Sequence, residues 1–171
     1  FKKHFKQTKM QMLLRGKNLV GYKEFDDSVI SLFIKNAAKE GIHIYRIFDA
    51  LNDVNNIKSS IEFVNREGKN SQGTMCYTTS PVHNEKYWLD IAKKIEDIGA
   101  TSLAIKDMAG LLRPNTAYEL IKKLKKNLNI PIYLHTHSTT GLADATNFKA
   151  YEAGVDNIDT SISSFSNLYA H

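Results

Sequence analysis

Three side chains of metal-binding types lie at the ends of two apolar runs. Lys106 follows the run 102–105, and His135 and His137 lie in the run 132–137. Residues two apart on a strand share a face, so both imidazoles can reach one ion. The alternative is a pair of hydrogen-bonded core histidines, and the spacing alone does not decide between the two. We predict that Lys106, His135 and His137 converge on one divalent metal ion.

The position of Lys106 needs its own explanation, because an unpaired ammonium group is costly to desolvate. A salt bridge to Asp107 or Asp49 is the simplest one. The functional alternative is an amine of lowered pKa that has captured CO₂, because the resulting carbamate is an oxygen ligand for a hard or borderline metal. The two histidines favour this alternative. We therefore predict Lys106 to be both a catalytic residue and a metal ligand.

Arg15, Tyr22 and Asp49 are predicted to bind substrate. The planar guanidinium of Arg15 suits a carboxylate, although a structural ion pair with Asp49 explains it equally well. Tyr22 can add a hydroxyl donor at the same rim, but a loop aromatic more often only packs. Arg15 is also predicted to be catalytic, because it would orient the substrate.

Short apolar segments alternate with amphipathic segments about every 30 residues. The predicted strands are 10–14, 44–48, 73–78, 102–105, 132–135 and 157–161. The predicted helices are 26–40, 54–67, 85–98, 114–128 and 142–153. The strands are apolar almost throughout, as in parallel strands that are covered on both faces. This alternation is typical of a parallel α/β sheet, either open or closed as a barrel.

Polar residues at the strand ends favour the barrel. A (β/α)₈ barrel builds its site from all its strand ends, whereas an open sheet often carries a glycine-rich phosphate loop, and no G-x-G-x-x-G follows any strand here. We predict a TIM (β/α)₈ barrel of which this chain, 1–171, is a partial domain with about six of eight units. The first two units and a C-terminal extension are expected to be absent. The strand-end residues are Arg15, Asp49, Thr79, Lys106, His137 and Ser161.

Composition excludes several other classes of protein. The formal net charge is +5, but the lysines are scattered through helical segments and no aromatic-basic motif indicates a nucleic-acid partner. The single cysteine, Cys76, excludes an intramolecular disulfide and is expected to be a buried, inert thiol. No run reaches the roughly 18 apolar residues of a membrane span. A cytoplasmic location is expected.

Several longer motifs carry a family resemblance. MLLRGKNLVGY, FDALND, GTMCYTTSPVH, IKDMAGLLRP, LHTHSTTGLA and EAGVDNIDTSISS cover nearly the whole chain. Together they resemble the carboxyltransferase domain of biotin-dependent enzymes, in particular the oxaloacetate decarboxylase α subunit and the carboxyltransferase subunit of pyruvate carboxylase. The resemblance implies a TIM barrel in which Lys106 is carboxylated. His135 and His137 would then bind zinc, manganese or cobalt.

The resemblance also implies roles at the substrate. Arg15 would hold the carboxylate of a 2-oxo acid, and Tyr22 would lie near substrate or biotin. A further aspartate ligand in an R-D-x-H-Q motif, and a threonine that moves a proton, belong to family segments outside this chain. Residues 163–171, SSFSNLYAH, depart from the usual SSxSxGTSQP of the family, so we expect an atypical rim there.

The expected reaction is biotin-dependent transfer of a carboxyl group between oxaloacetate and biotin, giving pyruvate. Running it towards carboxylation, as in pyruvate carboxylase, is one alternative. A metal-dependent Claisen-type lyase or synthase on a related barrel is another, and a non-catalytic assembly subunit is a third. The expected partners are a biotinyl carrier domain and a biotin carboxylase or membrane decarboxylase subunit, the latter placing the protein at the periphery of a membrane complex. A homo-oligomer is also expected.

Overall fold

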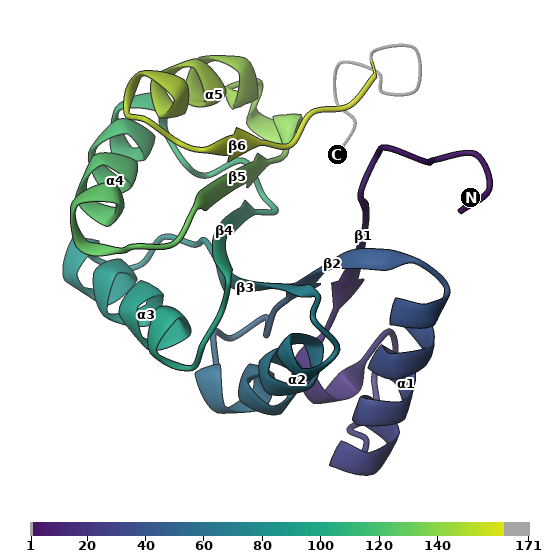
Figure 1. Ribbon diagram of the computed structural model, residues 1–171. Helices are drawn as coiled ribbons and strands as arrows, with labels where there is room; N and C mark the ends of the chain where they lie inside the picture. Colours follow the sequence, from purple (N-terminus) through teal and green to yellow (C-terminus); the bar gives the residue numbers. More distant parts are fainter. Residues whose placement is uncertain (1, 163–171) are drawn as a thin grey trace.

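The computed structural model describes residues 2–162, in which six parallel strands form a curved sheet with helices on its convex side (Figure 1). The strand order is β1-β2-β3-β4-β5-β6, so every neighbour in the sheet is also the neighbour in the chain. The strands are β1 (Met10–Leu14), β2 (Ile42–Ile47), β3 (Asn70–Cys76), β4 (Ser102–Asp107), β5 (Ile132–Thr136) and β6 (Asn157–Ile158). The helices are α1 (Asp27–Lys39), α2 (Val54–Arg66), α3 (Glu85–Asp97), α4 (Pro114–Asn127) and α5 (Ala143–Glu152), with short 3₁₀ turns at Gly16–Asn18 and Ser138–Thr140.

Local sequence signals explain where the helices begin and end. Asn84 accepts a hydrogen bond from the Tyr87 N–H at the start of α3, and Asp53 does the same for Asn55 at α2. Pro114 occupies the first turn of α4, where its missing N–H costs little. Four helices are followed by a glycine with positive φ, a conformation that other residues adopt only with strain. These glycines are Gly41, Gly68, Gly99 and Gly154.

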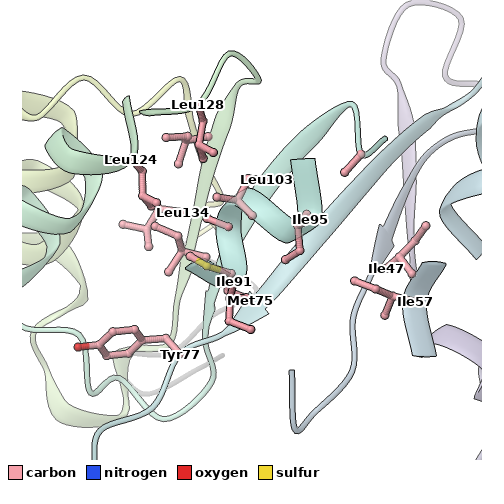
Figure 2. Packing of buried hydrophobic residues seen from close by; sticks show 14 of the residues in the cluster. Ile47, Ile57, Met75, Tyr77, Ile91, Ile95, Leu103, Leu124, Leu128 and Leu134 are labelled. Atoms are coloured by element: carbon pink, nitrogen blue, oxygen red, sulfur yellow. The ribbon is translucent and has the colours of Figure 1, made fainter. Parts of the chain in front are cut away.

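The hydrophobic core lies between the convex face of the sheet and the helices. Ile47 of β2 and Ile57 of α2 belong to it, as do Met75 of β3, Ile95 of α3 and Leu134 of β5 (Figure 2). All five side chains are at most 2% exposed. The predicted amphipathic helices therefore place their apolar stripes against the sheet as expected.

The concave face of the sheet is more polar than the sequence patterns predict. Register partners share a face, and Arg46 pairs with Gln72, which in turn pairs with Ser102. Gln72 is fully buried and Ser102 is 6% exposed. The prediction of strands that are apolar on both faces is wrong for this inner face, because its polar side chains bond to one another.

The strand–helix alternation and the barrel curvature are confirmed, since the six units form a half-barrel. Two strands begin earlier than predicted. β2 begins at Ile42, which pairs with Met10 of β1, and β3 begins at Asn70, because the polar residues Ser71 and Gln72 also pair in the ladder. β6 is shorter than the predicted 157–161 and ends at Ile158. The partial-domain assignment of residues 1–171 stays a prediction, and the atypical segment 163–171 lies outside the described residues. Within 2–162, no helix has the length and apolar content needed to cross a membrane.

Candidate active site

Lys106 and His135 are direct neighbours on adjacent strands. They are register partners of β4 and β5, and Cys76 of β3 is the partner of Lys106 on the other side. Lys106 is only 7% exposed. The Nε2 atoms of His135 and His137 lie 2.9 Å apart. The structure therefore brings the three predicted metal-binding residues to the carboxyl ends of β4 and β5.

The hydrogen bonds around His135 define its tautomer. Its Nδ1 lies 2.9 Å from Oδ2 of Asp159, and a carboxylate only accepts, so Nδ1 carries the proton. His135 Nε2 is then an acceptor, and the bond between the two rings requires His137 Nε2–H to donate. A histidine that donates one ring N–H to a carboxylate while offering its other nitrogen is the arrangement typical of metal ligands.

The donor set fits a borderline divalent metal. Two imidazole nitrogens that bind one zinc ion tetrahedrally, each at about 2.0 Å, lie about 3.3 Å apart, close to the separation seen here. Across residues 2–162, no three His, Cys, Asp or Glu side chains form a group that could hold a metal. A carbamate on Lys106 would be the third ligand from this part of the chain. That the three residues bind a metal stays a prediction.

Burial and the charge of Arg46 lower the pKa of Lys106. Within 2–162 no carboxylate lies at ion-pair distance from its Nζ, which instead lies 5.8 Å from the centre of the Phe48 ring. The salt bridge to Asp107 or Asp49 that would explain Lys106 structurally is therefore not formed among these residues. The lowered pKa favours the neutral amine, which is the form that can react with CO₂.

Asp107 has a structural role instead. It is fully buried, and its carboxylate accepts the backbone N–H groups of Leu111 and Leu112, each at 2.9 Å. It also accepts the hydroxyl of Thr136 on β5 at 2.9 Å. The backbone N–H of His137 also donates to the Asp107 carbonyl at 3.0 Å. Asp107 therefore connects the β4–α4 loop to the end of β5.

Gly110 allows that loop to approach the backbone of His137. Its φ is +66°, and a Cβ there would lie 2.7 Å from the His137 carbonyl oxygen. The Thr140 hydroxyl donates to the Gly110 carbonyl at 2.7 Å, which completes the contact. Only glycine accommodates both the backbone conformation and the close approach.

Arg15 lies directly after β1, where the sequence predicts it. Its Nη1 donates to the Gly21 carbonyl at 3.4 Å, and its guanidinium carbon lies 4.9 Å from the centre of the Tyr22 ring. Tyr22 is 93% exposed. The two predicted substrate residues are thus in contact at the rim, while the alternative ion pair between Arg15 and Asp49 is not formed.

Asp49 organises the β2–α2 loop. One carboxylate oxygen accepts the backbone N–H groups of Leu51 and Asp53, and the other accepts the Asn56 side-chain amide at 2.7 Å. Burial would raise the pKa of Asp49, but these hydrogen bonds outweigh it and lower the pKa. Its predicted contact with substrate is untested and stays a prediction.

An open hollow of about 1010 Å³ lies beside His135 and Asp159. Lys9 and Asn147 line it as well. The hollow is large enough for a small 2-oxo acid. His135 is therefore open to this hollow, whereas Lys106 and His137 are not among the residues that line it.

Sequence reasoning missed Arg46 and Asp159. Arg46 donates to Asp159 through Nη1 and, at 3.2 Å, through Nη2, and Asp159 in turn accepts from His135. Burial would raise the pKa of Asp159, but the hydrogen bonds from His135 and Arg46 hold that pKa well below its usual range. An arginine inside an otherwise apolar strand was the available signal.

Two named proteins have sequences similar to almost the whole of this chain. A pyruvate carboxylase subunit of Methanocaldococcus jannaschii is 49% identical over 164 residues, which are 96% of this chain and 29% of that protein. The methylmalonyl-CoA carboxyltransferase 5S subunit of Propionibacterium freudenreichii is 45% identical over 168 residues, which are 97% of this chain and 33% of that subunit. The chain thus spans about a third or less of the length of these relatives.

Solved structures agree with the fold. The carboxyl transferase domain of Rhizobium etli pyruvate carboxylase with pyruvate and biocytin has a TM-score of 0.94 and 40% identity to this chain. The match covers 96% of this chain and 29% of that one. The family model described as HMGL-like matches residues 41–165, most of the described half-barrel. The chain therefore belongs to the HMGL-like family, and its half-barrel corresponds to part of a carboxyltransferase domain.

Proposed function

We propose that this chain supplies the metal-binding side of a biotin-dependent carboxyltransferase. The reaction moves a carboxyl group between carbon 3 of oxaloacetate and biotin, and leaves pyruvate. The observation that carries the proposal is the convergence of Lys106, His135 and His137 at the ends of two adjacent strands. The similarity to carboxyl transfer domains, at about 40% identity, supports it.

Each residue has a definite task in this proposal. His135 would offer the lone pair of its Nε2, and His137 would offer its own Nε2 in the tautomer that carries the proton on Nδ1. Lys106 would contribute a carbamate oxygen after capture of CO₂. A bound zinc, manganese or cobalt ion would supply Lewis-acid polarisation of the 2-oxo group of the substrate. Arg15 receives the substrate carboxylate in its guanidinium fork and thereby orients the C–C bond that breaks. Tyr22, whose ring centre lies 4.9 Å from the Arg15 guanidinium carbon, would lie near substrate or biotin, and Asp49 would bind substrate from the β2–α2 loop.

Biotin would arrive on a carrier domain or subunit that is distinct from the described residues. The relatives named above are pyruvate carboxylase and transcarboxylase subunits, so carboxylation of pyruvate is supported at least as well as decarboxylation of oxaloacetate. A biotin carboxylase or membrane decarboxylase subunit is the proposed partner, according to the direction. A Claisen-type lyase is less well supported, since the similar proteins are named as carboxyl transfer enzymes.

The test is an assay of oxaloacetate decarboxylation by the whole protein with added biotin, together with elemental analysis of bound metal. We expect stoichiometric zinc, manganese or cobalt and a turnover that excess avidin abolishes. His137→Ala should lose metal and turnover together, because it removes one imidazole ligand. His4→Ala, in the exposed N-terminal turn, is the matched control and should keep both.

Three results would contradict the proposal. Retention of metal and turnover by His137→Ala would remove the metal assignment. Turnover that avidin leaves untouched would indicate a lyase. Wild-type protein with neither metal nor turnover would indicate an assembly subunit.

A further inference from the structure

Arg46 is a buried arginine without a part in the chemistry proposed above. It lies within β2 and is 2% exposed. Its Nε donates to Oε1 of Gln72, whose amide nitrogen lies 3.5 Å from the hydroxyl of Ser102. Burial of a charged pair is expensive, and apolar residues of similar volume often stabilise a fold as well or better. Stability alone therefore does not explain an arginine at this position.

The acceptor of Arg46 is also the acceptor of His135. Asp159 receives both terminal nitrogens of Arg46, one on each carboxylate oxygen. The Oδ2 atom, which accepts from Arg46 Nη1, also accepts from His135 Nδ1. A carboxylate bound by a guanidinium fork is restricted to one orientation. The carboxylate is thus a fixed acceptor for the imidazole.

A fixed acceptor at Nδ1 of His135 determines that the opposite ring nitrogen, Nε2, is the unprotonated one. The proton stays on Nδ1, so the lone pair of His135 stays on Nε2, the atom that lies 2.9 Å from His137 Nε2. A free histidine distributes its proton between the two nitrogens, and only one of these tautomers offers Nε2 as a ligand. The ring orientation is restrained together with the proton.

We propose that Arg46 is a positioning residue which, held by Gln72, fixes Asp159 and through it the tautomer and ring orientation of His135. This inference deepens the proposed function, since it concerns the same histidine, and it assigns Arg46 no contact with substrate or metal. Partners of this kind behind a metal-binding histidine commonly change metal affinity by a factor of about 10–100.

The topology explains why an arginine is required. β3, β4 and β5 separate β2 from β6, so the side chain has to reach across the concave face of the sheet. A lysine keeps the charge, but its three donors radiate from one nitrogen, so it cannot bond to Gln72 and to both oxygens of Asp159 in one fixed plane. Arg46→Lys therefore tests geometry separately from charge.

The first readout is the histidine tautomer, measured by long-range ¹H–¹⁵N spectra of the metal-free full chain at pH 8. Wild type should show His135 with a protonated Nδ1 and an unprotonated Nε2, with the signals assigned by their loss in His135→Gln. Arg46→Lys and Asp159→Leu should each shift the two ¹⁵N signals towards each other, as in a mixture of tautomers. The double variant Arg46→Lys/Asp159→Leu should shift the signals no further than Asp159→Leu alone, because both changes act through one contact.

The second readout is the Kd for zinc, measured by competition with a chromophoric chelator. Arg46→Lys should raise it about 10–100-fold. Arg66→Lys, on the exposed surface of α2, is the matched control and should change neither readout. Unchanged tautomer signals and zinc affinity in a folded Arg46→Lys would overturn the proposal.

If Arg46→Lys does not fold, Gln72→Leu tests whether Arg46 positions His135. It removes the acceptor of Arg46 Nε and should shift the His135 signals in the same direction, whereas unchanged signals would overturn the proposal. A wild-type chain with the expected tautomer but without zinc binding would overturn the proposed function and still support the positioning of His135. The two proposals can therefore fail separately.

Discussion

The guanidinium of Arg46 on β2 bonds to the carboxylate of Asp159, which lies 113 positions later and follows β6. This contact spans the concave side of the half-barrel from one edge region to the other. It places a negative charge beside His135 and a positive charge near Lys106. One ion pair thus acts on two of the three predicted metal ligands.

The first prediction concerns Arg15. Arg15→Lys keeps a positive charge but loses the planar fork, so we expect the KM for oxaloacetate to rise about tenfold or more with a smaller change in kcat. Steady-state kinetics of the whole protein measure both constants. Arg113→Lys, at the exposed start of α4, is the control. An unchanged KM for Arg15→Lys would exclude Arg15 from substrate binding.

The second prediction concerns Asp107. Asp107→Ala removes the acceptor of two backbone N–H groups and one hydroxyl; the bond from Leu112 is buried, and those from Leu111 and Thr136 are partly buried. We expect the free energy of unfolding to fall by about 3 kcal/mol or more. Urea unfolding followed by circular dichroism measures it. Asp90→Ala, on the exposed side of α3, should change it by less than about 0.5 kcal/mol. Similar values for the two variants would refute the structural role of Asp107.

The third prediction compares two glycines that have nearly the same φ. Gly110→Ala places a methyl group against the His137 carbonyl, whereas Gly68→Ala meets nothing within 4 Å. Both variants carry the backbone strain, about 1 kcal/mol, and only Gly110→Ala should cost about 2 kcal/mol more. Urea unfolding of both proteins isolates the clash. Equal losses would show that the loop moves away without cost.

The fourth prediction concerns pH and Asp156. Burial would raise the pKa of this carboxyl, but the hydrogen bonds from Lys125 and from the Ile132 N–H lower it below the unfolded value. A carboxyl with a lowered pKa stabilises the fold above its unfolded pKa, and this contribution disappears as pH falls through the folded pKa. Asp156→Asn should therefore cost about 1 kcal/mol at pH 7 and much less at pH 3.

Urea unfolding of wild type and Asp156→Asn at both pH values checks this difference. Asp90→Asn is the control for the general effect of removing a carboxylate. A stability gap between wild type and Asp156→Asn that stays constant from pH 7 to pH 3 would show that Asp156 does not act through its charge.

The fifth prediction concerns Cys76. It is 3% exposed, and burial raises the pKa of its thiol to about 11. Only about one thiol in a thousand is ionised at pH 8, so iodoacetamide should label the folded chain far more slowly than the urea-unfolded chain. Mass spectrometry of the labelled protein measures both rates. Rapid labelling of the folded chain would contradict a buried, inert thiol.

Local patterns were sufficient for the alternation of strands and helices and for the pairing of His135 with His137 on one face. Helix stripes, glycine stops and the two-residue repeat of a strand depend on neighbours in sequence. Strand ends were less well predicted, because Ser71 and Gln72 belong to a strand only when their partners on β2 and β4 are present.

The Arg46–Asp159–His135 chain could not be predicted in the same way. Its members are 113 and 24 positions apart, and they meet only because the sheet curves and parallel register aligns their strand ends. The role of Asp107 could not be predicted from the sequence either, because its position next to Lys106 suggested an ion pair between the two. Adjacent residues on a strand point to opposite faces, so Asp107 bonds to its own loop while Lys106 faces the histidines. Sequence spacing assigns a face, and the curvature of the sheet decides which distant side chains share it.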